Sequence, residues 1–182
     1  MIFKENQAEK LPGQLVEPSA QYEDSYVAGI LEFQALGEKG QKSIDELTED
    51  LRTYLADRRF NTIGRKDEEV EQLNLWFIAD GKFVGQVFLT PNIDDLAFGN
   101  LGYEVVPSQR RKGYATEMLR LALMKARELG MQRAVLVCRE DNSASRKVIE
   151  TNGGVYKGAV FPAGLNMKCL RFSIPLSGDS GE

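Results

Sequence analysis

Residues 107–115 read PSQRRKGYA, and they join an apolar strand to the strongest helical pattern in the chain. Pro107 ends the strand predicted at 101–106, and apolar residues recur at helical spacing over 113–129. Where a strand is followed by a basic turn and then by the first turn of a helix, the backbone N–H groups at that point have no intrahelical acceptor. Together with the helix dipole these donors suit a pyrophosphate, so the turn predicts an anion site.

The turn differs from the two common phosphate-binding motifs. The GxGxxG pattern of dinucleotide-binding folds is absent. Residues 37–43 read GEKGQKS, but relative to a P-loop the lysine is displaced and Ala35 stands where the first glycine belongs. The cations Arg110, Arg111 and Lys112 add positive charge at the predicted anion site.

Upstream of the turn, the sequence predicts two helices and a β-meander. One helix is expected over 22–36, ended by Gly37, and another from Ser43 to about Arg58. The expected strands are 15–18, 71–79, 83–89 and 101–106, with Asp80-Gly81 as the hairpin turn between the second and the third.

Downstream of the turn, the continuous apolar run at 134–138 predicts a strand buried on both faces. A helix capped by Asn142 or Ser143 should follow, and strands at 155–161 and 168–174 complete the fold. The pattern predicts one α/β domain over 1–182, with a core of about 15–174 and terminal extensions at 1–14 and 177–182.

Composition excludes several kinds of chemistry. The 182 residues include no histidine, which excludes histidine general bases, Ser-His-Asp triads and histidine-ligated metals. Cys138 and Cys169 lack metal-binding spacing, so no metal site is expected. With no signal peptide and no apolar run near the roughly 20 residues that span a bilayer, a cytoplasmic protein without membrane contact is expected.

The charges are unevenly distributed along the chain. The net charge is −4, yet residues 107–147 hold ten cations and four acids, a net +6 against −10 elsewhere. Solvated helix faces explain most of this excess, whereas Arg110, Arg111 and Lys112 lie where an anion would bind. An acidic protein without a basic face and interleaved aromatic residues is not expected to bind nucleic acid.

Arg110-x-x-Gly113-x-Ala115 resembles the [Q/R]-x-x-G-x-[G/A] signature of the GCN5-related N-acetyltransferase (GNAT) superfamily. The family's asparagine-led element is matched by Asn142-Ser143-Ala144-Ser145. The segments LVEPS at 15–19 and SRKVIETNGG at 145–154 are similar to a bacterial branch of the family. The resemblance implies a mixed, mostly antiparallel sheet of six to seven strands, flanked by helices. It also implies a splay between the strands at 101–106 and 134–138.

The resemblance implies acetyl-CoA as cosubstrate and no metal. In the family, the basic turn binds the pyrophosphate, and pantetheine pairs with the splayed strand like an added strand. The positions assigned to the cofactor in this way are Val105, Val106, Arg110, Arg111, Lys112, Gly113, Tyr114, Ala115 and Asn142. For Asn142, a simple helix N-cap is an equally adequate interpretation.

The catalytic residues are less well defined by the resemblance. Glu104 is the candidate general base, with an ordinary solvent-facing strand glutamate as the alternative. Many relatives carry a tyrosine that protonates the leaving thiolate, seven residues after the asparagine, but here that position is Ile149. Ser145 is the candidate for this role, and Tyr103, Tyr156 or water are alternatives. Cys138 is expected to be an inert core thiol rather than an acetylated nucleophile.

The function implied is direct transfer of an acetyl group from acetyl-CoA to a primary amine of a small molecule or a protein. The acidic remainder of the chain indicates a cationic acceptor. The alternative is a non-catalytic acyl-CoA-binding module of the same fold, which turnover would distinguish. Many relatives are dimers, so the resemblance also allows a homodimer.

Overall fold

The computed structural model describes residues 13–56, 62–65, 68–91, 99–162 and 167–176. The helices are η1 (Ala20–Tyr22), α1 (Glu23–Ala35), α2 (Ile44–Ala56), η3 (Pro107–Gln109), α3 (Tyr114–Glu128) and α4 (Ser143–Thr151). The strands are β1 (Gln14–Val16), β2 (Thr62–Arg65), β3 (Glu68–Glu71), β4 (Leu73–Ala79), β5 (Lys82–Leu89), β6 (Leu101–Val105), β7 (Arg133–Arg139), β8 (Val155–Val160) and β9 (Cys169–Pro175).

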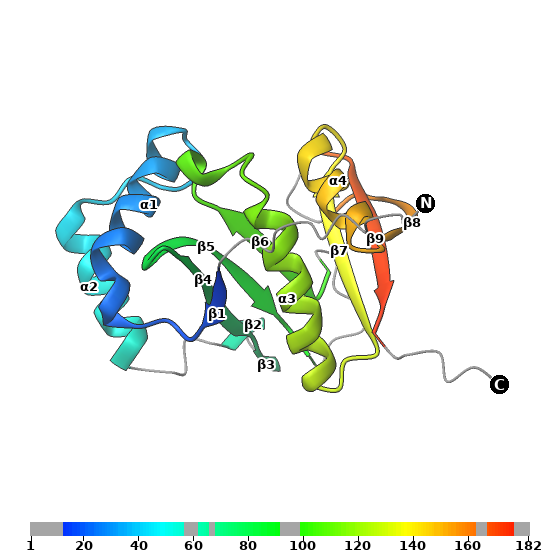
Figure 1. The fold of residues 1–182 in the computed structure, drawn as a ribbon, viewed down its shortest axis with the longest axis horizontal. Coiled ribbons are helices and arrows are strands. Elements are labelled where there is room, and N and C mark those ends of the chain that lie inside the picture. The colour runs from blue at the N-terminus through cyan, green and yellow to red at the C-terminus, as the bar shows by residue number, and fades with distance from the viewer. Residues whose placement is uncertain (1–12, 57–61, 66–67, 92–98, 163–166, 177–182) are drawn as a thin grey trace, which may run out of the picture.

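Two antiparallel sheets carry the fold (Figure 1). The first has the strand order β1-β4-β5-β6 and the second the order β7-β9-β8, while β2 and β3 pair as a separate hairpin. The predicted antiparallel sheet flanked by helices is therefore present, with its seven strands divided into two groups. The division falls between β6 and β7, the position of the expected splay.

Asn100 joins the two sheets at one end of this splay. Its backbone N–H donates to the Val135 carbonyl at 2.9 Å, and its Oδ1 accepts from the Val135 N–H at 2.7 Å. Its Nδ2 also donates to the Arg133 carbonyl at 3.2 Å. The neighbouring Gly99 has φ +82°, and a Cβ there would overlap the Val135 carbonyl, so this close approach requires glycine.

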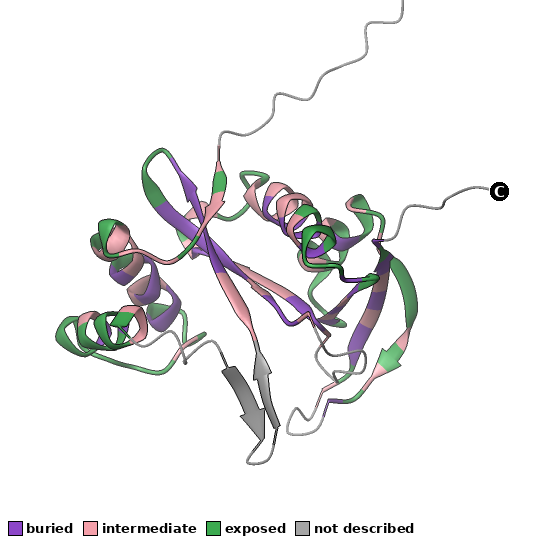
Figure 2. Ribbon diagram, turned by 90° about the horizontal axis from the view of Figure 1, so that it is seen from below, coloured by how far each residue is buried: buried purple, intermediate pink, exposed green. Residues whose placement is uncertain are grey.

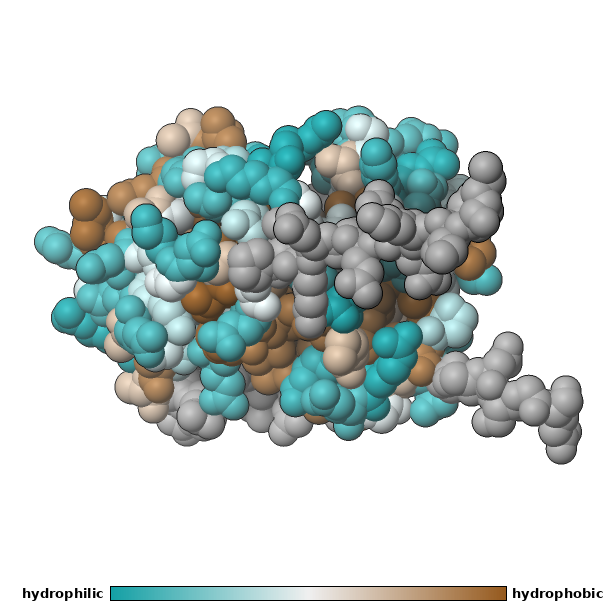
Figure 3. Space-filling view, viewed as in Figure 1, coloured by the Kyte–Doolittle hydropathy of each residue, from teal (hydrophilic) through white to brown (hydrophobic). Residues whose placement is uncertain are grey.

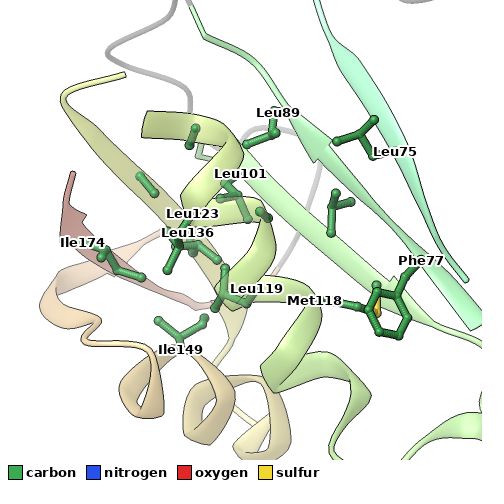
Figure 4. Packing of buried hydrophobic residues seen from close by; sticks show 14 of the residues in the cluster. Leu75, Phe77, Leu89, Leu101, Met118, Leu119, Leu123, Leu136, Ile149 and Ile174 are labelled. Carbon is green, nitrogen blue, oxygen red and sulfur yellow. The ribbon is translucent and has the colours of Figure 1, made fainter. Parts of the chain in front are cut away.

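Helices cover both faces of the first sheet. In Figure 1, α1 and α2 lie on one side and α3 crosses the other side, between the two sheets. Figure 2 shows β4 and β5 buried over most of their length, and Figure 3 shows hydrophobic residues reaching the surface in the middle of the face drawn in Figure 1. α3 buries Met118, Leu119 and Ala122 against residues of both sheets (Figure 4). The two sheets thus share one hydrophobic core.

A second hydrophobic cluster lies between α1, α2 and the opposite face of the first sheet. It centres on Trp76, which is 1% exposed and stacks on Tyr26 with ring centroids 4.6 Å apart. Phe83 packs edge-on against both rings. Trp76 and Phe83 are therefore core residues of the first sheet.

Most predicted elements are found close to their expected positions. Asp80 and Gly81 form the hairpin turn, both with positive φ, and Ser43 and Glu46 form a reciprocal capping box at α2. The β2–β3 hairpin was not predicted from the sequence. β7 was expected to be buried on both faces, but Val135 and Val137 are only half-buried, because α3 and α4 cover one face of the second sheet.

Candidate functional site

The turn between β6 and α3 presents five successive backbone amides that have no acceptor among the described residues. Arg111 and Gly113 both have positive φ, +65° and +84°, which turns the chain sharply into α3. The amides of Thr116 and Glu117 bond the Gly113 carbonyl, and the Arg110 amide bonds the Pro107 carbonyl. Within the described part of the chain, the amides of residues 111–115 have no such partner. Alternating backbone conformations of this kind form an anion-binding concavity.

Arg110 does not direct its guanidinium at this concavity. It forms a bidentate pair with Glu38 at 2.8 and 2.5 Å, and its Nε donates to the Val105 carbonyl at 3.1 Å. The hydrogen-bonded guanidinium lowers the pKa of Glu38. Lys112 is exposed and bonds Gln109, and Arg111 is exposed as well. Of the three cations at the turn, Arg111 and Lys112 therefore supply the exposed positive charge that no ion pair neutralises among the described residues.

β6 leaves a backbone edge open toward the splay. The Val106 amide donates to the Val84 carbonyl, so it serves the first sheet and offers no free donor. Since backbone groups alternate in direction along a strand, those of Tyr103 and Val105 face away from β5. The Val105 carbonyl is already bonded by Arg110. The Val105 N–H and both Tyr103 groups remain on the open edge.

Tyr103 spans the splay from β6 to the start of α4. Its hydroxyl lies 2.9 Å from Ser145 Oγ and 3.3 Å from the Ser145 carbonyl. Burial raises the pKa of Tyr103 to about 12, and the bond to Ser145 opposes this shift. Two residues that were separate candidates for protonating the thiolate are thus hydrogen-bonded to each other. Tyr156, the other candidate, packs on Phe172 and is exposed.

Three further residues at or beside α4 have structural roles. Asn142 caps the helix, its Oδ1 accepting from the Ser145 amide at 2.9 Å, while the side chain stays exposed. Ile149 is 1% exposed and belongs to the core. Cys138 is buried, and burial raises the pKa of its thiol, which disfavours the nucleophilic thiolate.

Glu104 faces the opposite side of the first sheet, toward α1. One carboxylate oxygen accepts from Gln86 Nε2, and Lys39 Nζ lies 3.0 Å from Oε1 and 3.1 Å from Oε2. Gln86 in turn accepts from Asn74 at 3.3 Å, so polar side chains of β4, β5 and β6 form a connected row. Tyr26 of α1 is near this row. Its own burial raises its pKa to about 12, and the negative charge of Glu104 adds to the shift.

The acidic residues of α1 are partly engaged elsewhere. Glu32 accepts bonds from the backbone and hydroxyl of Ser108, which fastens α1 to η3. Glu23 lies 3.6 Å from Arg52. Asp24 and Glu32 also line an open cavity of about 380 Å³ beside Lys82 and η3.

Most of the basic residues downstream of the turn form local ion pairs. The pairs are Arg120–Glu117, Lys125–Glu128, Arg139–Asp141 and Arg146–Glu150. Both partners are exposed in three of these pairs, whereas Glu117 is only 11% exposed. Exposed pairs of this kind contribute little to stability. Across the described ranges, no group of three or more His, Cys, Asp and Glu residues is arranged to hold a metal ion. No helix in those ranges is long and apolar enough to span a membrane.

The family model of an acetyltransferase (GNAT) domain matches residues 31–155, which include the turn, the splay and the start of α4. The chain belongs to the GNAT acetyltransferases. This family of acyltransferases is the one that the turn and the asparagine-led element resemble in sequence. Comparison with curated proteins gave no match.

Solved structures of GNAT proteins share the fold. The microcin C7 self-immunity acetyltransferase MccE, solved with acetyl-CoA and AMP, is 18% identical, with a TM-score of 0.65 and coverage of 90% of this chain and 92% of that one. RimJ of Mycobacterium smegmatis, solved with CoA-disulfide, is 20% identical, with a TM-score of 0.68 and coverage of 90% and 81%. An acetyltransferase of Salmonella typhimurium that modifies the N-terminal serine of ribosomal protein L7/L12 is 15% identical, with a TM-score of 0.63 and coverage of 90% and 94%.

Several residues of this site were not identified from the sequence. Lys39 and Glu38 lie in a turn-rich connection, and their partners on β6 and in the basic turn are 65 and 72 residues away. Gln86 gave no signal beyond its position in a strand. For Asn100 the only hint was a polar residue at the start of an apolar strand.

Proposed function

We propose that the protein transfers the acetyl group of acetyl-CoA directly to a primary amine of a small molecule or protein. The observation that carries the proposal is the row of unpaired amides at residues 111–115, beside the open edge of β6. The amides and the α3 dipole suit the CoA pyrophosphate, with Arg111 and Lys112 adding charge. Arg110 then contributes through its position in the turn rather than as a phosphate ligand.

The open edge of β6 would bind the pantetheine arm as an added strand. The Val105 N–H and the backbone groups of Tyr103 are its donors and acceptors, and Asn142 lies at the start of α4 on the far side. A β6 amide directed at the thioester oxygen would stabilise the charge that develops there. By analogy with oxyanion holes, such a donor contributes about 3 kcal/mol.

Glu104 is the proposed general base. An acceptor amine must lose a proton before it attacks the thioester carbon, and a half-buried carboxylate on the splayed strand suits this task. Gln86 holds one of its oxygens and so fixes the orientation of the carboxylate. The cationic acceptor suggested by the acidic remainder of the chain would be attracted to the same group.

Ser145 is the proposed proton donor to the leaving thiolate, with Tyr103 behind it. When Tyr103 donates to Ser145 Oγ, the Ser145 hydroxyl is itself a donor, and its hydrogen would turn from the Cys138 thiol, to which it is hydrogen-bonded here, to the CoA sulfur. The raised pKa of Tyr103 keeps its phenol protonated at neutral pH. This pair would serve where relatives carry tyrosine at the position of Ile149.

The alternative function, a non-catalytic acyl-CoA-binding module, is favoured by one observation. Lys39 occupies both oxygens of Glu104, so the proposed base is engaged before any acceptor arrives. Binding of acetyl-CoA is common to both functions, and only turnover distinguishes them. We propose a cytoplasmic location for either, supported by two cysteines that are buried and free.

The test begins with calorimetric titration of acetyl-CoA, with NADH and ATP as controls, followed by a thiol-release screen of amines. We expect selective binding of acetyl-CoA and thiol release with one class of amine. Glu104→Gln should lower turnover by about a hundredfold at neutral pH and leave acetyl-CoA affinity nearly unchanged. Absence of acetyl-CoA binding by the folded protein would refute the proposal, and unchanged turnover in Glu104→Gln would exclude Glu104 as the base.

A further inference from the structure

Among the residues that the structure describes, Lys39 is the cation that forms an ion pair with the proposed base. Its Nζ lies almost equally far from the two oxygens of Glu104, at 3.0 and 3.1 Å, although 65 residues separate the two in sequence. The two side chains are 31% and 26% exposed, so the pair is neither buried in the core nor free in solvent. An acceptor ammonium about to be deprotonated by Glu104 would have to occupy the same position.

Two further contacts hold Lys39 at this position. Its Nζ lies 5.1 Å from the centre of the Phe33 ring, on which Arg110 also stacks at 5.6 Å. The preceding residue, Glu38, is fixed to Arg110, which is itself fixed to the end of β6. The connection between α1 and α2 is therefore fastened, at the residue before Lys39, to the turn that follows the splayed strand. This arrangement differs from a lysine that samples solvent freely.

We propose that Lys39 is itself an acetyl acceptor, so that the enzyme acetylates its own Nζ when acetyl-CoA is bound. This inference rests on the proposed function, because it uses Glu104 as base and the splay as the thioester site. Glu104 removes one proton from the ammonium, and the nitrogen lone pair attacks the thioester carbon. The N–C bond forms as the C–S bond breaks, and the second proton lost by the nitrogen ends on the CoA sulfur. Glu104 releases its proton to solvent.

The product changes the charges at the site. Nε-acetyl-lysine carries no charge, so it cannot maintain the ion pair with Glu104. Acetylation of Lys39 would thus release Glu104 for an external amine. The modification fits an enzyme whose base is occupied in the unmodified state.

Lys42 supplies an internal control. It lies three residues further along the same connection and pairs with Asp50 at 2.5 Å, and it is more exposed than Lys39. Uncatalysed acetylation by acetyl-CoA requires an exposed, neutral amine. The greater exposure of Lys42 favours it there, whereas the pair with Asp50, which raises the pKa of Lys42, opposes it, so Lys42 serves as a neighbouring ion-paired lysine that is not next to Glu104. Acetylation directed by Glu104 would favour Lys39.

The experiment is incubation of the full chain with acetyl-CoA and no acceptor, followed by intact mass spectrometry. Cleavage after glutamate yields one peptide, residues 39–46, that carries both lysines, and fragmentation then distinguishes them. We expect a gain of one acetyl group on Lys39 and none on Lys42. The gain should disappear in Lys39→Arg and slow by about a hundredfold in Glu104→Gln.

Calorimetric titration of acetyl-CoA into the same sample distinguishes failure of this inference from failure of the proposed function. Binding without acetylation of Lys39, or acetylation of Lys42 at an equal rate, would overturn this inference and leave the proposed function standing. Failure to bind acetyl-CoA would overturn both. A rate at Lys39 that is unchanged by Glu104→Gln would also overturn it.

Discussion

Gly113 is the residue on which the anion site depends most directly. Its φ of +84° lies in the left-handed region, which costs a side chain about 1–2 kcal/mol. Arg111 adopts the same region without being glycine, at +65°. Positive φ in a residue with a side chain is uncommon, and it concentrates at sites where the backbone itself has a function.

Substitution of Gly113 tests the site. Gly113→Glu should abolish acetyl-CoA binding, because a side chain and a negative charge would both enter the pyrophosphate concavity. Gly113→Ala is the matched control, and it should weaken binding less while lowering the free energy of unfolding by about 1–2 kcal/mol. Calorimetry and urea denaturation measure the two effects. Unchanged affinity in folded Gly113→Glu would show that the turn does not bind the cofactor.

The raised pKa of Tyr26 predicts how the free energy of unfolding depends on pH. Its pKa in the folded protein is about 12, above the ordinary 10.0, because burial disfavours the phenolate. The unfolded chain therefore loses this proton first as the pH rises. Stability is fully present below pH 10 and falls between pH 10 and 12, by at most about 1.4 kcal/mol per pH unit for this group.

The variant Tyr26→Phe isolates this effect. We expect its free energy of unfolding to fall less steeply than that of the wild type above pH 10, as measured by urea denaturation at a series of pH values. Comparison at pH 7 and 8 gives the baseline difference from the lost hydroxyl. Parallel pH curves for the two proteins would contradict the prediction.

At the scale of elements, α4 combines a structural cap with a proposed cofactor contact. Asn142→Ser separates the two, since serine is also a good N-cap. Unfolding free energy should change by only a few tenths of a kcal/mol. Acetyl-CoA affinity should fall if the amide binds pantetheine, as titration calorimetry would measure. Unchanged affinity would mean that Asn142 is a cap alone.

Elements with a clear hydrophobic period or a characteristic turn could be predicted from the sequence. Features that depend on packing against residues far away in the sequence could not. α3 and α2 follow from helical spacing and caps, and the Asp80-Gly81 turn follows from its residue types. The alternating burial of β7 could not be predicted, because its apolar run gives no sign of which face the helices leave open. β2 and β3 are short and rich in charged residues, so they lack the alternation that marks a strand.

The same limit applies to the candidate site. The basic turn and the asparagine-led element are local in sequence, and a short motif describes each of them. The contacts of Tyr103 with Ser145 and of Lys39 with Glu104 join residues 42 and 65 positions apart. Only the folded chain brings such pairs together.

At the scale of the whole molecule, the two sheets form a wedge held at one end by Asn100. Asn100→Ala removes two side-chain hydrogen bonds and leaves the part-buried Val135 amide unpaired. We expect a loss of about 2–4 kcal/mol in unfolding free energy and weaker acetyl-CoA binding, since part of the binding energy must then align the sheets. Urea denaturation and calorimetry measure these effects.

Asn100→Asp is the matched control for this prediction. It keeps an acceptor for the Val135 amide, but it places a carboxylate at a position that is 5% exposed, with one oxygen against the Arg133 carbonyl. Its loss of stability at neutral pH should therefore be at least as large as that of Asn100→Ala, and it should shrink at low pH, where the carboxyl group is protonated. Equal stability of Asn100→Ala and wild type would show that the core shared through α3 holds the sheets together without the asparagine.

The Glu38–Arg110 pair has an evolutionary consequence. Arg110 is the first residue of the signature, yet its charge is neutralised by the carboxylate of Glu38, 72 positions earlier in the chain. Loss of either partner alone would leave the other charge without its counterion beside the Phe33 ring. The two positions should therefore be inherited as a unit, so that lineages which replace the arginine also lose the acid at position 38.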